Sequence, residues 1–96
     1  MLFRSSAIVV DKGGKLKGIF TDGDLRRHLA SDKNLPNRPI KEVMTKNPAS
    51  IGKEKLAAQA FDILKSKKID ELPVVDVAGR VVGLLDIQDL LKAGLV

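Results

Sequence analysis

The sequence contains the same pattern twice, at positions 65 residues apart. Residues 7–11 (Ala-Ile-Val-Val-Asp) match residues 72–76 (Leu-Pro-Val-Val-Asp), and the match continues downstream without a gap. It pairs Gly14 with Gly79, Lys15 with Arg80, Gly18 with Gly83, Ile19 with Leu84, Phe20 with Leu85, Asp24 with Asp89 and Leu25 with Leu90. The chain therefore contains an internal duplication, and we expect two copies of one structural unit.

Each copy has the pattern of a β-hairpin followed by a helix. A short β-branched strand leads into an Asp-x-x-Gly turn, at residues 11–14 and again at residues 76–79, and a second apolar strand follows. Asp initiates such turns and Gly adopts the positive φ that they need. Thr21 or Asp22 can cap the first helix and Asp86 the second, and the acidic residues complement the positive end of each helix dipole.

The region between the two copies begins with a linker. Residues 31–39 combine polar residues with two prolines, which cannot continue a helix, so we expect a surface segment there. Residues 40–51 are predicted to dock onto the fold, with Val43 and Met44 buried and residues 49–51 forming a short buried strand. The second copy thus has a strand upstream of its hairpin.

A further helix is predicted before the second hairpin. It has about fourteen residues starting near Lys53, because apolar residues recur on one face with the spacing i, i+4, i+7 and i+8: Leu56, Ala60, Ile63 and Leu64, extended by Ala57 and Phe61. The second copy is expected to run strand, helix, strand, strand, helix, whereas the first begins at its second strand. Either the chain is a piece of a longer protein, or a neighbouring molecule supplies the missing elements.

Composition narrows the classes of function. Apolar residues make up 44% of the chain and charged residues 30%, which favours a folded domain. No apolar stretch approaches the roughly 20 residues that cross a bilayer, and no secretion signal is visible, so a cytoplasmic location without a membrane partner is expected. There is no cysteine, and the single histidine, His28, has no partner for a metal site. The net charge of +5 is scattered and the aromatic residues are only three Phe, so no nucleic-acid partner is expected.

Several of these segments resemble a known family. Residues 72–76, the turn glycine, Gly-Leu-Leu at residues 83–85 and the acidic helix start resemble a CBS (cystathionine-β-synthase-type) motif, and two such motifs in tandem resemble a CBS pair. Residues 18–27 (Gly-Ile-Phe-Thr-Asp-Gly-Asp-Leu-Arg-Arg) and residues 89–94 are similar to the C-terminal part of bacterial arabinose 5-phosphate isomerases. The resemblance covers essentially the whole chain.

The resemblance implies an α/β tandem CBS pair built from β-α-β-β-α repeats around a pseudo-two-fold axis. A truncated first motif, lacking its N-terminal strand and helix, would occupy residues 1–30, a linker residues 31–39, and the second motif residues 40–96. Isomerases of this kind join a sugar-isomerase domain to a C-terminal CBS pair, and they supply a precursor of Kdo, the acidic sugar of lipopolysaccharide. The sugar-isomerase domain is absent from this chain.

Two roles remain open for such a module. The resemblance implies a regulatory module that senses a nucleotide or nucleotide-sugar, such as CMP-Kdo or an adenine nucleotide, with no permanent cofactor. The alternative is a scaffold, because CBS pairs often associate two by two and a homodimer of CBS pairs would hold isomerase subunits together. Ligand binding and association are separable properties, so both roles can be tested.

The chain carries no catalytic constellation of its own. The isomerase reaction, which interconverts D-arabinose 5-phosphate and D-ribulose 5-phosphate, needs a positioned base and acid in a pocket. Asp22 and Asp24 stand at a helix start, where capping explains them. Glu42, Glu54 and Glu71 lie on segments predicted to be at the surface. We therefore expect neither a catalytic residue nor a metal site in this chain.

The resemblance also implies a ligand site. In CBS pairs, a ribose is held by the Asp three positions after a Ser or Thr, and Thr21 and Asp24 match this spacing. A carboxylate accepts hydrogen bonds from both ribose hydroxyls, and a helix N-terminus presents N–H groups to a phosphate. Helix capping alone would also explain both residues. The predicted ligand-binding residues, with the opposite wall supplied by the other copy, are Ile19, Thr21, Gly23, Asp24, Thr45, Pro48, Ala49, Ile69 and Asp70.

The second copy offers a related but weaker site. Its expected residues are Asp86, Asp89, Arg4 and Ser5. Asp86 stands where the first copy has the hydroxyl of Thr21, so a phosphate there would meet like charge. Beside the principal site, Arg26 and Arg27 would either reach an anionic ligand or form a solvated helix face.

Overall fold

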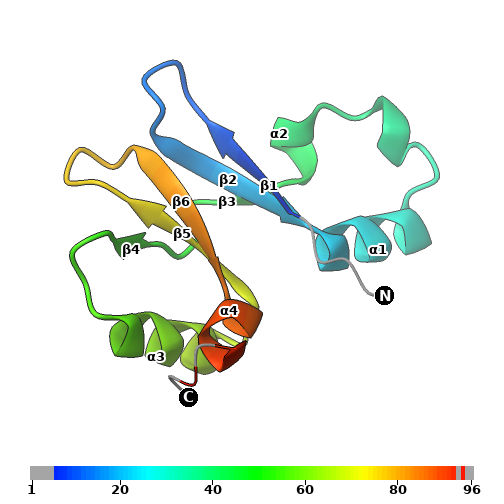
Figure 1. Cartoon of the computed structure of the whole chain (residues 1–96). Helices are drawn as coiled ribbons and strands as arrows, with labels where there is room; N and C mark the ends of the chain where they lie inside the picture. Colours follow the sequence, from blue (N-terminus) through cyan, green and yellow to red (C-terminus); the bar gives the residue numbers. More distant parts are fainter. Residues whose placement is uncertain (1–5, 93, 95–96) are drawn as a thin grey trace.

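The fold consists of two small sheets, and in each of them a helix follows the β-hairpin (Figure 1). The computed structural model describes residues 6–92 and 94. The first sheet has the strand order β1-β2-β3 and the second the order β4-β5-β6. The first half contains β1 (Ser6–Val10), β2 (Leu16–Thr21), α1 (Asp22–Ser31) and β3 (Thr45–Lys46). The second half contains β4 (Ile51–Gly52), α3 (Ala57–Lys67), β5 (Glu71–Val75), β6 (Val81–Asp86) and α4 (Ile87–Lys92). The short helices η1 (Leu35–Asn37) and α2 (Ile40–Val43) lie between α1 and β3.

The two hairpins repeat each other residue by residue. β1 pairs with β2 in an antiparallel register that begins with Ser6 opposite Thr21, and β5 pairs with β6 in a register that begins with Glu71 opposite Asp86. Each hairpin has a bulge at the same place, between Val9 and Val10 in the first and at the equivalent position of the second. The predicted duplication is confirmed by this shared register.

The two hairpin tips meet in a reciprocal contact. The Leu16 N–H donates to the Gly79 carbonyl at 3.2 Å, and the Val81 N–H donates to the Gly14 carbonyl at 3.0 Å. The offset of 65 residues converts one of these hydrogen bonds into the other, because Leu16 corresponds to Val81 and Gly14 to Gly79. Lys15 and Arg80, which also correspond to each other, form a β-bridge between the two tips. The predicted pseudo-two-fold relation is therefore confirmed.

The turn aspartates hold the hairpin tips in shape. Asp11 Oδ1 accepts hydrogen bonds from the backbone N–H groups of Gly13 and Lys15. Asp76 Oδ1 accepts the equivalent hydrogen bonds from Ala78 and Arg80. Gly14 and Gly79 have φ values of 83° and 84°, which a residue with a side chain adopts only with strain. The predicted turn chemistry is thus present in both copies.

These turns predict a pH dependence of stability. The hydrogen bond from the Lys15 N–H lowers the pKa of Asp11 below 3.8, and the hydrogen bond from the Arg80 N–H does the same for the pKa of Asp76. A lowered folded-state pKa gives stability that is complete above the unfolded value and is lost as the pH falls through the folded value. In urea unfolding between about pH 5 and about pH 2, the Asp11→Asn/Asp76→Asn double variant should therefore lose less stability than the wild type. Parallel losses in the two proteins would contradict this expectation.

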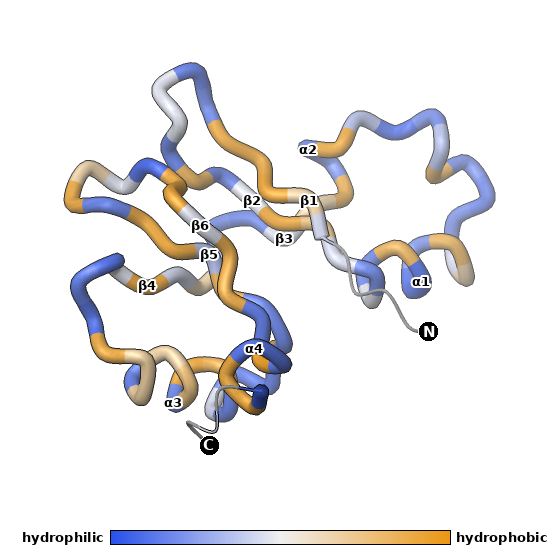
Figure 2. The backbone as a smooth tube through the Cα atoms, in the orientation of Figure 1, coloured by the Kyte–Doolittle hydropathy of each residue, from blue (hydrophilic) through white to orange (hydrophobic). Residues whose placement is uncertain are grey.

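The larger core lies in the second half. Its buried side chains come from β4, α3, β5 and α4: Ile51, Ala60, Leu64, Leu72 and Leu90. Figure 2 shows the apolar stretches of these elements gathered in this half of the molecule. β4 is parallel to β5 and α3 connects them, so the strand, helix and hairpin close around one cluster.

The first half has a smaller core because, over the described residues, it contains no counterpart of β4 and α3. Leu25 occupies in α1 the position that Leu90 occupies in α4, yet 39% of Leu25 is exposed against 4% of Leu90. Leu29 is exposed as well. The apolar face of α1 is therefore open where α3 covers the equivalent face of α4.

Helix α3 begins later than predicted. The prediction of a start near Lys53 is wrong because the Lys53 N–H donates to the Val75 carbonyl at 2.9 Å and so continues the pairing of β4 with β5. A turn follows, closed by the hydrogen bond from the Lys55 N–H to the Gly52 carbonyl. Leu56 is consequently an exposed residue before the helix, where its N–H donates to Gln59 Oε1, and it does not join the core.

The segment between α1 and β4 differs from its prediction in four ways. Leu35 in η1 is buried, so residues 31–39 are not entirely a surface linker. Val43 and Met44 are half-buried rather than fully buried. The predicted strand at residues 49–51 is Ile51–Gly52 instead, and an unpredicted strand, β3, pairs antiparallel with β2 in the first sheet. Among the described residues, no helix is long and apolar enough to span a membrane.

Candidate functional site

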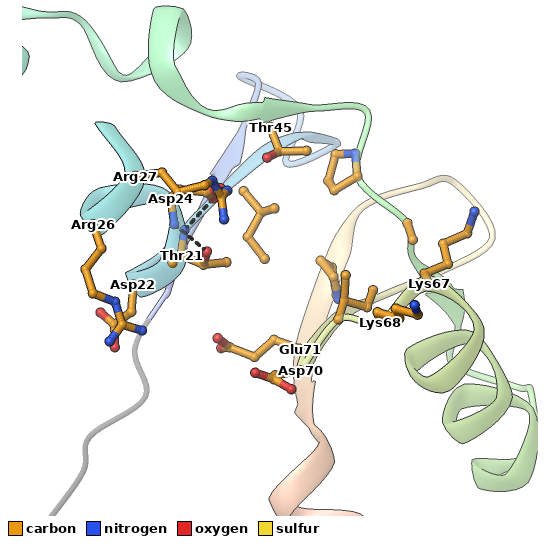
Figure 3. Close-up of a pocket in the computed structure, with 16 residues that line it drawn as sticks. Thr21, Asp22, Asp24, Arg26, Arg27, Thr45, Lys67, Lys68, Asp70 and Glu71 are labelled. Atoms are coloured by element: carbon orange, nitrogen blue, oxygen red, sulfur yellow. Dashed lines mark hydrogen bonds and ion pairs between the residues drawn. The ribbon is translucent and has the colours of Figure 1, made fainter. Parts of the chain in front are cut away.

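A cavity of about 650 Å³ lies between the two halves. One wall comes from the end of β2 and the start of α1, and the other comes from the segment after β3 and from the segment that joins α3 to β5 (Figure 3). All nine residues predicted for the principal ligand site line it: Ile19, Thr21, Gly23, Asp24, Thr45, Pro48, Ala49, Ile69 and Asp70. The duplication brings these residues together because each half supplies a different wall.

The first wall is set by the cap of α1. The Asp24 N–H donates to Thr21 Oγ1 at 3.2 Å, and the Thr21 N–H donates back to Asp24 Oδ2 at 2.9 Å. This reciprocal capping box fixes both side chains at the point where β2 turns into α1. The predicted helix cap is therefore confirmed, and it aims the N-terminus of α1 at the cavity.

Asp24 is the buried charge of this wall. Only 5% of the residue is exposed. Its second carboxylate oxygen, Oδ1, accepts a hydrogen bond from Arg27 Nη2, and this contact is also an ion pair. Both oxygens of Asp24 thus have a donor, which satisfies the requirement that a buried carboxylate be hydrogen-bonded and paired.

The second wall is held by the C-terminus of α3. Lys68 ends this helix in the left-handed conformation, with φ of 55°, and its N–H donates to carbonyls of the last turn. The Ile69 N–H donates to the Leu64 carbonyl at 3.0 Å, and the Asp70 carbonyl accepts the Ile87 N–H at 2.8 Å. These backbone contacts fix the short crossing segment, and Figure 3 shows Asp70 and the neighbouring Glu71 on the side toward α1, with Lys67 and Lys68 on the far side.

The lining combines basic side chains with apolar ones. Two arginines, Arg26 and Arg27, come from α1, and two lysines, Lys67 and Lys68, come from the end of α3 on the opposite side (Figure 3). The lining also includes five apolar residues, namely Ile19, Pro48, Ala49, Ile69 and Pro73. A cavity of this kind suits a ligand that has a flat apolar part, hydroxyl groups and an anionic group.

Seven lining residues were absent from the predicted list of site residues: Asp22, Arg26, Arg27, Lys67, Lys68, Glu71 and Pro73. For the two arginines, contact with an anionic ligand had been left open against a solvated helix face. Glu71 was predicted to be at the surface, but this is wrong: it is half-buried, and its Oε2 accepts the Ser6 hydroxyl at 2.7 Å. Glu71 and Pro73 lie two residues apart in β5 and so share one face of that strand, and this period-two spacing was the available signal for them. The two lysines directly precede the predicted Ile69.

Asp86 and Asp89, two of the four residues of the weaker predicted site, do not line this cavity. Asp86 Oδ1 accepts the Gln88 N–H at 2.7 Å at the start of α4, which is the predicted capping role. Asp89 is exposed on α4. Arg4 and Ser5 lie outside the described residues. Within the described residues, Asp86 and Asp89 thus have no opposite wall like the one that faces Asp24 in the first half.

His28 and the acidic residues form no metal centre within the part of the chain that the structure describes, where no group of three or more His, Asp or Glu could hold a metal ion. His28 is partly exposed and stacks on Phe20, with the ring centroids 6.2 Å apart and the ring planes 20° from parallel. Its role in the described structure is packing against the end of β2.

The sequence matches the family described as CBS domain over residues 1–31 and 40–96. It is 47% identical over 87 residues to the arabinose 5-phosphate isomerase KdsD of Pseudomonas aeruginosa, a match that covers 91% of this chain and 27% of that protein. The chain thus spans about a quarter of the length of this relative.

Two solved structures share the fold. The CBS domain pair of protein MJ0100 in complex with 5′-methylthioadenosine and S-adenosyl-L-methionine has a TM-score of 0.82 at 30% identity, covering 93% of this chain and 68% of that one. CBSX2 in complex with AMP has a TM-score of 0.80 at 26% identity, covering 94% of this chain and 70% of that one. The bound molecules in both structures contain adenosine.

Proposed function

Because this chain belongs to the CBS domain family and has the fold of a tandem CBS pair, we propose that it is the regulatory part of a longer arabinose 5-phosphate isomerase and binds a nucleotide between its halves. The identity to the isomerase of Pseudomonas aeruginosa supports the parent enzyme. A sugar-isomerase domain elsewhere in the parent protein would then carry the catalytic residues. The cavity is the observation that carries the proposal.

The chemistry of the cavity supports a nucleotide. Asp24 is a carboxylate that can accept ribose hydroxyls, and Thr21 places a hydroxyl three residues before it at the N-terminus of α1, where a phosphate is favoured. Ile19 on one wall and Ile69 on the other offer apolar surface to a base. Each feature also has a structural role, so only a binding measurement separates the two.

The proposed regulation follows from the place of the cavity. A ligand that touches both halves stabilises the arrangement that it fits, and it shifts the parent enzyme only by its difference in affinity for the two arrangements. CMP-Kdo is the proposed feedback ligand, since the parent enzyme would supply the Kdo route and a cytidine ribose suits Asp24. An adenine nucleotide is the alternative, which the AMP complex of CBSX2 supports.

Titration calorimetry with AMP and with CMP-Kdo tests this proposal. Asp24→Asn keeps an oxygen for the Thr21 N–H but removes the charge, so we expect it to weaken binding at least about tenfold. Asp89→Asn is the matched control, because Asp89 holds the equivalent position outside the cavity and should leave binding unchanged. Absence of binding by the wild type at millimolar concentrations of both compounds would contradict the sensor role.

A scaffold role is the second candidate, and exposed apolar residues favour it. Val82, Leu84 and Leu91 in β6 and α4 are exposed in the isolated chain. A second CBS pair would bury such residues and thereby hold isomerase subunits together. Light scattering of the wild type and of Asp24→Asn would separate the roles: unchanged association in a variant that no longer binds nucleotide shows that association does not need the ligand.

A further inference from the structure

The carboxylate expected to hold the ribose is already occupied. Asp24 Oδ2 accepts the Thr21 N–H at 2.9 Å, and Asp24 Oδ1 accepts Arg27 Nη2. The Asp24 side chain is 7% exposed, whereas the Arg27 side chain is 72% exposed and lines the cavity. Figure 3 shows the guanidinium lying against the carboxylate. A ligand that enters the cavity therefore meets Arg27 before it reaches Asp24.

The two donors on Asp24 differ in how easily they leave. The Thr21 N–H belongs to the capping box of α1, so losing its bond would undo the start of the helix. The Arg27 guanidinium is held by its ion pair with Asp24, and the flexible side chain that carries it is largely exposed to solvent. Oδ1 is thus the oxygen of Asp24 at which a ligand hydroxyl can replace a protein donor.

The displaced guanidinium needs a new anion close by. A methyl group built on Gly23 would lie 3.5 Å from Arg27 Nη1, so the guanidinium already lies over the first turn of α1. A phosphate bound at that turn would therefore receive Arg27 after a small movement, and charge-assisted hydrogen bonds to phosphate suit a guanidinium. An uncharged nucleoside would take Oδ1 and leave the guanidinium without an anion.

From this geometry we infer that Arg27 is a latch on Asp24 that makes the cavity selective for phosphorylated nucleotides over uncharged nucleosides. The inference rests on the proposed nucleotide site and adds the residue that sets its selectivity. Arg80 provides the matched control, because its guanidinium also pairs with an aspartate, Asp76 at 3.1 Å, but neither residue lines the cavity.

Titration calorimetry of the whole chain tests the latch with two ligand pairs, adenosine with AMP and cytidine with CMP. Arg27→Gln should bind the nucleosides about three- to tenfold more tightly than the wild type, because the competing donor is weaker, and should bind the nucleotides no more tightly. Arg80→Gln should leave nucleoside affinity unchanged. Arg27→Lys, which keeps the charge, should lie between the wild type and Arg27→Gln. Because Arg27 is largely exposed, circular dichroism should show all variants folded.

Each outcome bears on the latch or on the site. Unchanged nucleoside affinity in Arg27→Gln overturns the latch, and Asp24-dependent nucleotide binding by the wild type would in that case leave the proposed function standing. An equal gain in Arg80→Gln also overturns it, since any lost positive charge would then have the same effect. Absence of binding by both the wild type and Arg27→Gln overturns the latch together with the nucleotide site.

Discussion

Replacing Leu90 by alanine should lower the free energy of unfolding by about 2–4 kcal/mol, whereas the same replacement at Leu25 should lower it by less than about 1 kcal/mol. The two leucines occupy the same position in the two copies. Leu90 is buried in the cluster formed by β4, α3, β5 and α4, so its removal leaves a cavity. Leu25 lies on the open face of α1, where water already reaches it.

Urea unfolding at neutral pH measures both losses, and Leu91→Ala provides a control on the exposed face of α4. We expect Leu91→Ala to resemble Leu25→Ala. A cost at Leu25 equal to that at Leu90 would contradict the expectation and would mean that another molecule covers α1 in solution. Repeating the measurement over a range of protein concentrations would separate that case, since coverage by a second copy weakens on dilution.

Gly18→Ala is expected to cost about 1–3 kcal/mol, and Gly83→Ala, the equivalent change in the other half, about 0.5 kcal/mol or less. A methyl group on Gly18 would lie 2.3 Å from Met44 Sδ and 2.8 Å from Met44 Cγ. On Gly83 the nearest atom would be Val74 Cβ at 3.8 Å, an ordinary contact. The backbone of Gly18 cannot move away because β1 pairs on one side of it and β3 on the other.

Thermal and urea unfolding of the two single variants test this difference, and a double variant identifies its cause. If Met44 is the obstacle, Gly18→Ala/Met44→Ala should lose less stability than the sum of the two single losses. Strict additivity would contradict the steric explanation. Equal costs at Gly18 and Gly83 would show instead that both strands simply resist a larger residue.

The sequence predicted most of what depends on neighbours along the chain. The Asp-x-x-Gly turns, the cap at Thr21 and the equivalence of the two hairpins all follow from local rules that a duplicated pattern reinforces. The predicted start of α3 was wrong because a tertiary contact determines where the helix begins. The Lys53 N–H pairs with β5, and nothing local to Lys53 indicates that partner.

The same limit explains the candidate site. The nine predicted residues line one cavity, because the repeat and the family resemblance together indicate which segments face each other. Strand β3 was missed because it has only two residues, Thr45 and Lys46, which is too short a run to show the period-two pattern of a strand, and because its partner, β2, is distant in the sequence. The ion pair between Arg27 and Asp24 was missed because the sequence allowed Arg27 to face either a ligand or water.

Strand β3 also decides where the module can be divided. Thr45 and Lys46 follow the polar linker in the chain but complete the sheet of the first half. A chimaera that swaps halves between related proteins at residues 32–39 would therefore give each first sheet a foreign edge strand. A crossover point that leaves both sheets intact lies between Lys46 and Ile51. Recombined or designed genes should therefore join the two halves there rather than within residues 32–39.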